Sequence, residues 1–138
     1  MKIGEICSIQ NGQNKDRALN IEGNIPVYGS GSRPLFMTNE FNREGRTCKI
    51  NKIKSNRQIM IMNEKYFLNN NAFTIISNDE TIITNEYLWF YLETNQYLLQ
   101  YTGIAISKID MQHFRNIEIP VPSIIRQFEI RNIQNQAI

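Results

Sequence analysis

Residues 85–101, NEYLWFYLETNQYLLQY, form the one long segment of the chain with the periodicity of an amphipathic helix. Thr84 precedes this segment as a capping residue, and Glu86 lies in the first turn, where the helix dipole favours an acidic side chain. The remaining apolar runs are short and are separated by polar segments rich in asparagine and glycine. This pattern predicts an α+β fold: a mixed or antiparallel twisted sheet with one long helix, short helices and the start of a C-terminal coiled-coil-type helix.

The positions of the remaining elements follow from short alternating or apolar runs. A short helix is expected at residues 108–114, and a final helix is expected from Ile124, with Ser123 as its cap. We therefore expect one folded unit over residues 1–122, followed by the start of a C-terminal helix over residues 123–138. Strands are expected at residues 7–10, 25–28, 48–53, 58–62, 73–76 and 117–121.

The composition restricts the chemistry that the chain can carry out. Its 138 residues fit one domain, and its two cysteines, Cys7 and Cys48, are expected to be buried free thiols. His113 is the only histidine, which argues against a zinc site and against a Ser-His-Asp catalytic centre. No apolar window is long enough to span a membrane, and the first residues lack a signal-peptide pattern. A cytoplasmic protein without a membrane partner is therefore expected.

Charges are unevenly distributed along the chain, although the net charge is only +2. Residues 33–57 are mainly basic, whereas residues 78–100 contain acidic residues and no basic one, which predicts a basic side and an acidic side of the fold. The aromatic residues of the expected long helix have acidic neighbours, which favours packing in the core over stacking on bases. They are Tyr87, Trp89, Phe90, Tyr91 and Tyr97.

Residues 29–32, Gly-Ser-Gly-Ser, directly follow an expected strand. The candidate interpretations of this segment are a phosphate cradle, a catalytic turn and a plain loop. The Gly-Lys-Ser/Thr sequence of a P-loop does not follow, and neither does the helix of a dinucleotide fingerprint. The Gly-x-Ser-x-Gly pattern of a nucleophile elbow is also missing. We expect a tight turn beside the sheet, with approach of a phosphate to the amides of Ser30 and Ser32 as a further hypothesis.

Several segments taken in order give a more specific indication. The opening KIGEICSIQNGQ is followed by IPVYGSGS, NREGRTCKI, YFLNNNAFTII and the Tyr/Leu-rich helix. The tail then has a turn at Gly103, a short helix, the strand Ile-Pro-Val-Pro at 119–122, Gln127 and Ile130. In this order, nearly the whole chain resembles the target recognition domain of type I restriction-modification DNA specificity subunits.

Two positions depart from the pattern of that family. Val121 separates two prolines that are usually paired, and Arg126 stands where an acidic residue usually precedes the glutamine. A full specificity subunit contains two such domains, each followed by a long helix. The chain is therefore expected to be either one half of a longer protein or a stand-alone domain.

The resemblance implies sequence-specific binding to double-stranded DNA by a chain that is not itself an enzyme and needs no cofactor or metal. Methyl transfer and cleavage would belong to partners, a DNA methyltransferase subunit and a restriction subunit. An exposed stripe of Ile130, Ile133 and Ala137 would favour a homodimer through the C-terminal helix. Basic side chains in polar loops would contact phosphates, and amides or arginines would read bases. The candidate DNA-binding residues are Lys15, Arg17, Ser30, Ser32, Arg33, Arg43, Arg46, Lys49, Lys52, Lys54, Asn56, Arg57, Ser107 and Lys108.

Two other functions remain open on the sequence. A protein-interaction or assembly domain with the same fold that no longer reads DNA is favoured by the modest net charge and the short final helix. A small enzyme is disfavoured by the lack of a recognisable cluster of histidine, cysteine or carboxylate side chains. Salt-sensitive, sequence-selective binding to duplex DNA would distinguish the recognition domain from both.

Overall fold

A four-stranded antiparallel sheet forms the centre of the molecule. The computed structural model describes residues 1–16 and 23–136, with side chains as far as residue 133. Neighbouring strands of this sheet all run antiparallel, and the two central strands, β7 and β4, are the most buried. The strand order is β1 (Cys7–Asn11), β7 (Ala72–Ser77), β4 (Arg46–Asn51) and β5 (Ile59–Asn63).

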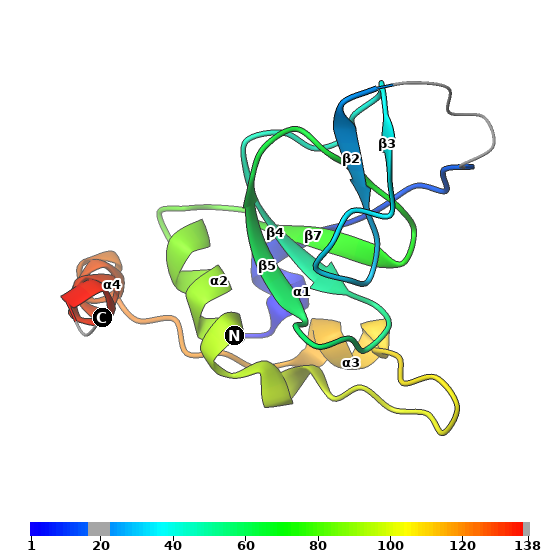
Figure 1. Ribbon diagram of the computed structural model, residues 1–138. Coiled ribbons are helices and arrows are strands. Elements are labelled where there is room, and N and C mark those ends of the chain that lie inside the picture. Colours follow the sequence, from blue (N-terminus) through cyan, green and yellow to red (C-terminus); the bar gives the residue numbers. More distant parts are fainter. Residues whose placement is uncertain (17–22, 137–138) are drawn as a thin grey trace.

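A second, smaller sheet lies at one end of the first (Figure 1). Its central strand β2 (Ile25–Tyr28) pairs antiparallel with β3 (Phe36–Thr38) and parallel with β6 (Phe67–Leu68). A small apolar cluster made by Tyr28, Met62, Tyr66, Leu68 and Ala72 joins the two sheets. The α+β class is confirmed, but the strands form two sheets where one was expected. The second sheet was not predicted because β3 and β6 are too short to show a clear alternation in the sequence.

Helices cover the four-stranded sheet and enclose the main core (Figure 1). They are α1 (Ile3–Ile6), α2 (Asn85–Thr94), the 3-10 helix η2 (Gln96–Leu99), α3 (Met111–Asn116) and α4 (Ile124–Gln136). Fully buried Phe73 of β7 packs edge-on against Phe114 of α3, with ring centroids 5.1 Å apart. Trp89 of α2 donates from its indole N–H to the Ile75 carbonyl, which fixes this helix on the sheet.

The long helix expected over residues 85–101 is shorter than the periodicity predicts. It begins as expected, because the Thr84 hydroxyl accepts the Tyr87 amide at 3.1 Å. It ends at Thr94, where two side chains compete for the helical carbonyls: Thr94 Oγ1 donates to the Phe90 carbonyl, and the Asn95 amide donates to the Tyr91 carbonyl at 2.8 Å. A short 3-10 helix then carries the chain to Gln100.

Two other expected elements also differ. The short helix starts at Met111 instead of residue 108, because the Asp110 carboxylate caps it by accepting the amides of Gln112 and His113. Residues 117–121 do not form a strand of either sheet. They run beside the first residues of the chain, where Ile3 donates to the Ile117 carbonyl and Ile119 donates to the Met1 carbonyl.

The last helix, α4, packs beside α2 at the edge of the molecule (Figure 1). One fully buried side chain, Gln127, joins it to the body of the domain: its oxygen accepts the Thr84 amide, and its nitrogen donates to the carbonyls of Ile82 and Pro122. Within residues 1–16 and 23–136, no helix has both the length and the hydropathy that crossing a membrane requires.

Candidate nucleic-acid interface

Three loops that are distant in the sequence lie side by side at one end of the central sheet. The Lys54 amide donates to the Ser107 carbonyl, and the Ile109 amide donates to the Lys52 carbonyl, both at 2.8 Å. Ser30 Oγ in turn accepts the Ile53 amide at 3.0 Å. We call residues 29–33, 52–57 and 102–108 the three-loop surface. It carries nine of the predicted residues: Ser30, Ser32, Arg33, Lys52, Lys54, Asn56, Arg57, Ser107 and Lys108.

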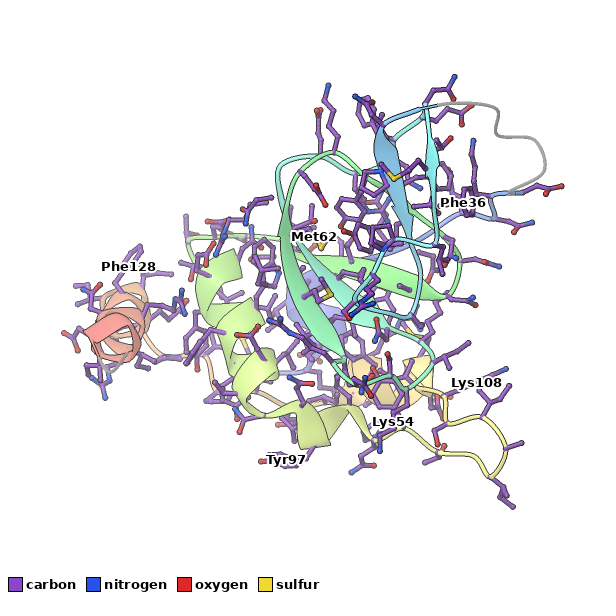
Figure 2. The ribbon with its side chains drawn as sticks, in the orientation of Figure 1. Phe36, Lys54, Met62, Tyr97, Lys108 and Phe128 are labelled. Carbon is purple, nitrogen blue, oxygen red and sulfur yellow. The ribbon has the colours of Figure 1, made fainter. Side chains whose placement is uncertain are left out.

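The three-loop surface has one sign of charge. Its loops contain Arg33, Lys52, Lys54, Arg57 and Lys108 and no aspartate or glutamate. Arg33, Lys54 and Lys108 are exposed, and Lys54 and Lys108 lie along one edge of the molecule (Figure 2). Such a cluster suits a polyanion, because several cations on one surface can contact successive phosphates.

Lys49 does not belong to this exposed surface. Its side chain is fully buried, and its ammonium donates to the carbonyls of Gly29 and Gly31 and to Asn51 Oδ1 at 2.7–2.9 Å. Burial lowers the pKa of Lys49 to about 8. The Gly-Ser-Gly-Ser segment is thus a turn whose Gly29 and Gly31 carbonyls point inward and accept hydrogen bonds from the buried Lys49 ammonium.

Arg43 is likewise a structural residue. Its guanidinium donates to Thr74 Oγ1 and to the carbonyls of Asn42, Gln10 and Asn11 at 2.9–3.1 Å. These bonds tie the loop before β4 to β1 and β7. Four of its five N–H donors are used inside the domain and the residue is buried, so Arg43 is poorly placed to contact a phosphate or a base.

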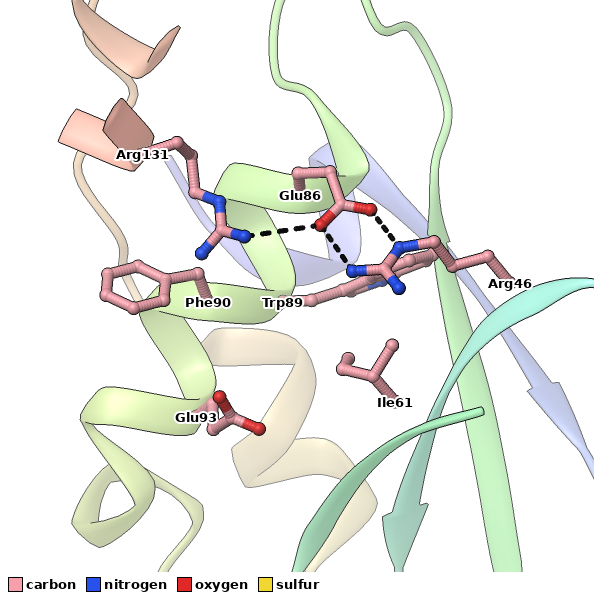
Figure 3. A pocket seen from close by; sticks show the side chains of 7 residues that line it. All are labelled: Arg46, Ile61, Glu86, Trp89, Phe90, Glu93 and Arg131. Atoms are coloured by element: carbon pink, nitrogen blue, oxygen red, sulfur yellow. Dashed lines mark hydrogen bonds and ion pairs between the residues drawn. The ribbon is translucent and has the colours of Figure 1, made fainter. Parts of the chain in front are cut away.

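The expected separation into a basic side and an acidic side is only partial, because Arg46 and Arg57 of the basic segment pair with Glu86 and Glu93 of the acidic segment. Arg46 of β4 makes a two-pronged ion pair with Glu86 of α2, and Arg131 of α4 approaches the same carboxylate at 3.7 Å (Figure 3). The hydrogen bond from Arg46 is the main cause of the lowered pKa of Glu86. These charges line a pocket of about 110 Å³ and join β4, α2 and α4.

Lys15 and Arg17 are not part of the three segments that form the three-loop surface. Lys15 Nζ makes a 2.8 Å ion pair with Glu40 and lies over the Phe67 ring at 5.1 Å. Arg17 is outside the described residues. On the three-loop surface itself, Arg57 is 3.6 Å from Glu93, a distance that leaves it only partly neutralised.

Both thiols are buried, as expected from the sequence. Burial raises the pKa of the Cys7 thiol to about 12 and also raises that of the Cys48 thiol. Neither is therefore suited to act as a nucleophile.

An open groove borders the three-loop surface and contains residues that charge patterns did not reveal. Its volume is about 400 Å³. Tyr97, expected in the core, is 73% exposed here, because the helix breaks before it and its side chain turns outward (Figure 2). The only sequence signal for this groove was the presence of two glutamines, Gln96 and Gln100, near the end of the expected helix. The groove is lined by Lys54, Gln58, Gln96, Tyr97, Gln100 and Tyr101.

Three solved structures with the same fold belong to type I restriction-modification systems. The S subunit of a type I restriction-modification system from M. genitalium has a TM-score of 0.84 at 17% identity over 96% of this chain and 37% of that chain. The HsdS subunit from Thermoanaerobacter tengcongensis has a TM-score of 0.70 at 20% identity over 99% and 36% of the two chains. The present chain thus spans well under half the length of these relatives.

A third structure, from a study of complex assembly and conformational transition of the type I R-M system, has a TM-score of 0.71 at 19% identity over 99% and 38% of the chains. No curated protein sequence matches significantly. The family model described as "Type I restriction modification DNA specificity domain" matches residues 1–138. The chain therefore belongs to the type I restriction-modification DNA specificity domain family.

Proposed function

We propose that this domain binds duplex DNA through the three-loop surface and selects the target sequence for a restriction-modification complex without catalysing a reaction itself. The observation that carries the proposal is the meeting of three distant loops that contain five cations and no carboxylate. Membership of a DNA specificity family supports duplex DNA as the polyanion. Phosphate contacts from the lysines would position the domain, and amide side chains beside them would read bases.

Selection from a pool of randomised duplexes at about 50 and 200 mM salt tests this proposal, because each phosphate contact contributes a salt-dependent term. We expect an enriched motif whose affinity falls steeply with salt. Replacing Lys54 and Lys108 together by alanine should reduce the slope of log K against log salt by about 2 and leave the motif unchanged. Replacing Lys2 and Lys65 together by alanine, which removes two exposed lysines outside the surface, serves as the matched control. An equal effect of the control would show that net charge, and not this surface, determines binding.

The chemistry of modification and cleavage would lie in partner subunits. A methyltransferase subunit and a restriction subunit are the partners that fit a specificity domain, and the study of one related structure concerns assembly of such a system. This proposal includes a cytoplasmic location, since duplex DNA and these partners would be found there. It also keeps the division of the chain into a recognition unit, residues 1–122, and the start of a helix at residues 123–138.

A second surface favours association with another protein. On α4, Ile125, Phe128 and Ile133 are 72%, 56% and 56% exposed, whereas Ile130 packs against the core. The exposed stripe therefore differs from the expected one, and Ala137 lies outside the described residues. We propose that this face pairs with a second copy of the helix. Sedimentation should show dimers that Phe128→Ser converts to monomers, and a concentration-independent monomer would refute pairing. Dimers without any DNA selectivity would favour the assembly-domain function.

A further inference from the structure

Gln100 has a backbone conformation that its residue type disfavours. It ends η2 with φ 50° and ψ 78°, and it is the only non-glycine residue with positive φ among the residues described. A Cβ atom makes this left-handed conformation unfavourable, and glycine is the common residue at such a helix end. The Gln100 side chain is exposed, and within the described part of the chain no hydrogen bond engages its amide. Glutamine therefore offers the fold no visible advantage here, which indicates a role outside the fold.

The hairpin that follows Gln100 presents an apolar tip. Thr102 and Lys108 exchange backbone hydrogen bonds at 2.8 and 2.9 Å, and the Tyr101 hydroxyl donates to the Asn51 carbonyl at 2.6 Å, which fixes the base of the hairpin on β4. At the tip, Ile104 is fully exposed and Ile106 is 55% exposed. Two neighbouring isoleucines held out on a hydrogen-bonded base form a small apolar surface that a partner could cover.

The surroundings of the tip indicate what that partner is. Lys54 and Lys108 flank the hairpin, and Lys54 also lines the groove that contains Gln100. Amide and apolar groups are thus presented together on a surface whose charge is complementary to phosphate. In the major groove, a glutamine amide can bond both N6 and N7 of adenine, and an apolar side chain can contact the C5-methyl of thymine.

We propose that Gln100 and the tip of the 102–108 hairpin read A·T pairs in the major groove, with Gln100 bonding adenine and Ile104 or Ile106 contacting a thymine methyl. This inference rests on the proposed function, since it assigns bases to the DNA that the domain would bind. Gln96 would have a lesser role, because its amide nitrogen already donates to the Glu93 carbonyl.

Base analogues placed in the enriched duplex test the proposal atom by atom. Replacing adenine by 7-deazaadenine removes N7, and replacing thymine by deoxyuridine removes the methyl group. At the contacted positions we expect each analogue to weaken binding by about tenfold, the size typical of a good base contact. Gln100→Gly should remove the response to 7-deazaadenine, and Ile104→Ser should reduce the response to deoxyuridine.

The variants are chosen so that misfolding does not imitate loss of readout. Glycine suits the positive φ of position 100, so Gln100→Gly should melt at or above the wild-type temperature. Gln10→Ala and Ile76→Ser alter an exposed glutamine and an exposed isoleucine on β1 and β7 and should leave both responses intact.

The outcomes separate this inference from the proposed function. Both would be supported by an enriched motif with an A·T pair whose 7-deazaadenine response is lost in Gln100→Gly and whose deoxyuridine response is reduced in Ile104→Ser. An enriched motif that lacks such a pair, or whose response to 7-deazaadenine persists in Gln100→Gly, would overturn the inference and leave DNA recognition standing. Failure to enrich any motif would overturn the proposed function, and the inference with it.

Discussion

Replacing Gln127 by leucine should detach α4 from the body of the domain. Glutamine offers one acceptor and two donors, and the cavity presents one N–H, from Thr84, and two carbonyls, from Ile82 and Pro122, at 2.8–2.9 Å. Leucine fills a comparable volume and satisfies none of these groups. Three lost hydrogen bonds at roughly 1 kcal/mol each give about 3 kcal/mol. For a chain of 138 residues that corresponds to a decrease in Tm of about 10 °C.

Thermal unfolding measures the size of this effect, and amide hydrogen exchange locates it. We expect faster exchange in α4 and at the Thr84 amide, with the central sheet less affected. Gln112→Leu, which changes an exposed glutamine of α3, should shift stability by no more than about 0.5 kcal/mol. A Gln127→Leu protein that melts within about 2 °C of the wild type would refute the assignment, since the expected 3 kcal/mol could not then be present.

Gln127→Glu distinguishes hydrogen bonding from packing. An ionised glutamate would face two carbonyls and lack a donor, so its pKa should rise in the folded state. The stability of this variant should be highest below the unfolded pKa of glutamate, about 4.3, and should be lost as the pH rises through the folded value. A constant difference from the wild type across pH would contradict this reasoning.

Three further perturbations have defined outcomes. The pKa of Lys49, lowered to about 8, lies below its ordinary value of 10.5, so the unfolded chain binds more protons between these values. The stability of the wild type relative to Lys49→Met should therefore rise from pH 7 to pH 10, by up to about 3 kcal/mol in chemical denaturation, and a flat difference would contradict it. Arg43→Met leaves the Gln10 and Asn11 carbonyls without their donor and should cost about 2–4 kcal/mol, measured by the same method; a loss below about 1 kcal/mol would argue against a structural role. Gly103→Ala would place a Cβ 2.2 Å from the Ile106 carbonyl oxygen at φ +133°, so it should distort the hairpin and lower DNA affinity several-fold with little change in Tm; unchanged affinity would exclude the hairpin from the interface.

Local sequence patterns predicted the strand at residues 25–28, the capping role of Thr84 and the start of α4, because each depends on neighbouring residues. The same patterns overestimated the length of the long helix. The side chains of Thr94 and Asn95 donate to the Phe90 and Tyr91 carbonyls, which backbone N–H groups would bond if the helix continued. Only the tertiary structure separates the DNA-binding candidates into exposed residues and buried structural ones. Lys49 and Lys54 look alike in the sequence, yet one is fully buried and the other is exposed.

The groove was missed for a similar reason. Gln100 belongs to it only because the helix breaks and the backbone adopts a positive φ, and neither event leaves a periodic signal. Its neighbours come from separate parts of the chain, including Lys54 and Gln58. A site made by the ends of distant segments is a property of chain topology, which single-sequence periodicity does not encode.

The pairing of residues 1–3 with residues 117–119 joins the two ends of the unit formed by residues 1–122. The backbone bonds Ile3 to Ile117 and Ile119 to Met1 hold the segment that begins the unit against the segment that leads into α4. The three-loop surface is formed by loops that lie in the sequence between these two paired ends. If these loops bind DNA as proposed, substitutions in them would alter which DNA is contacted while the geometry at the junction with α4 stays the same. Under the proposed function, target preference could therefore diverge without a change in the surface that α4 offers to a partner.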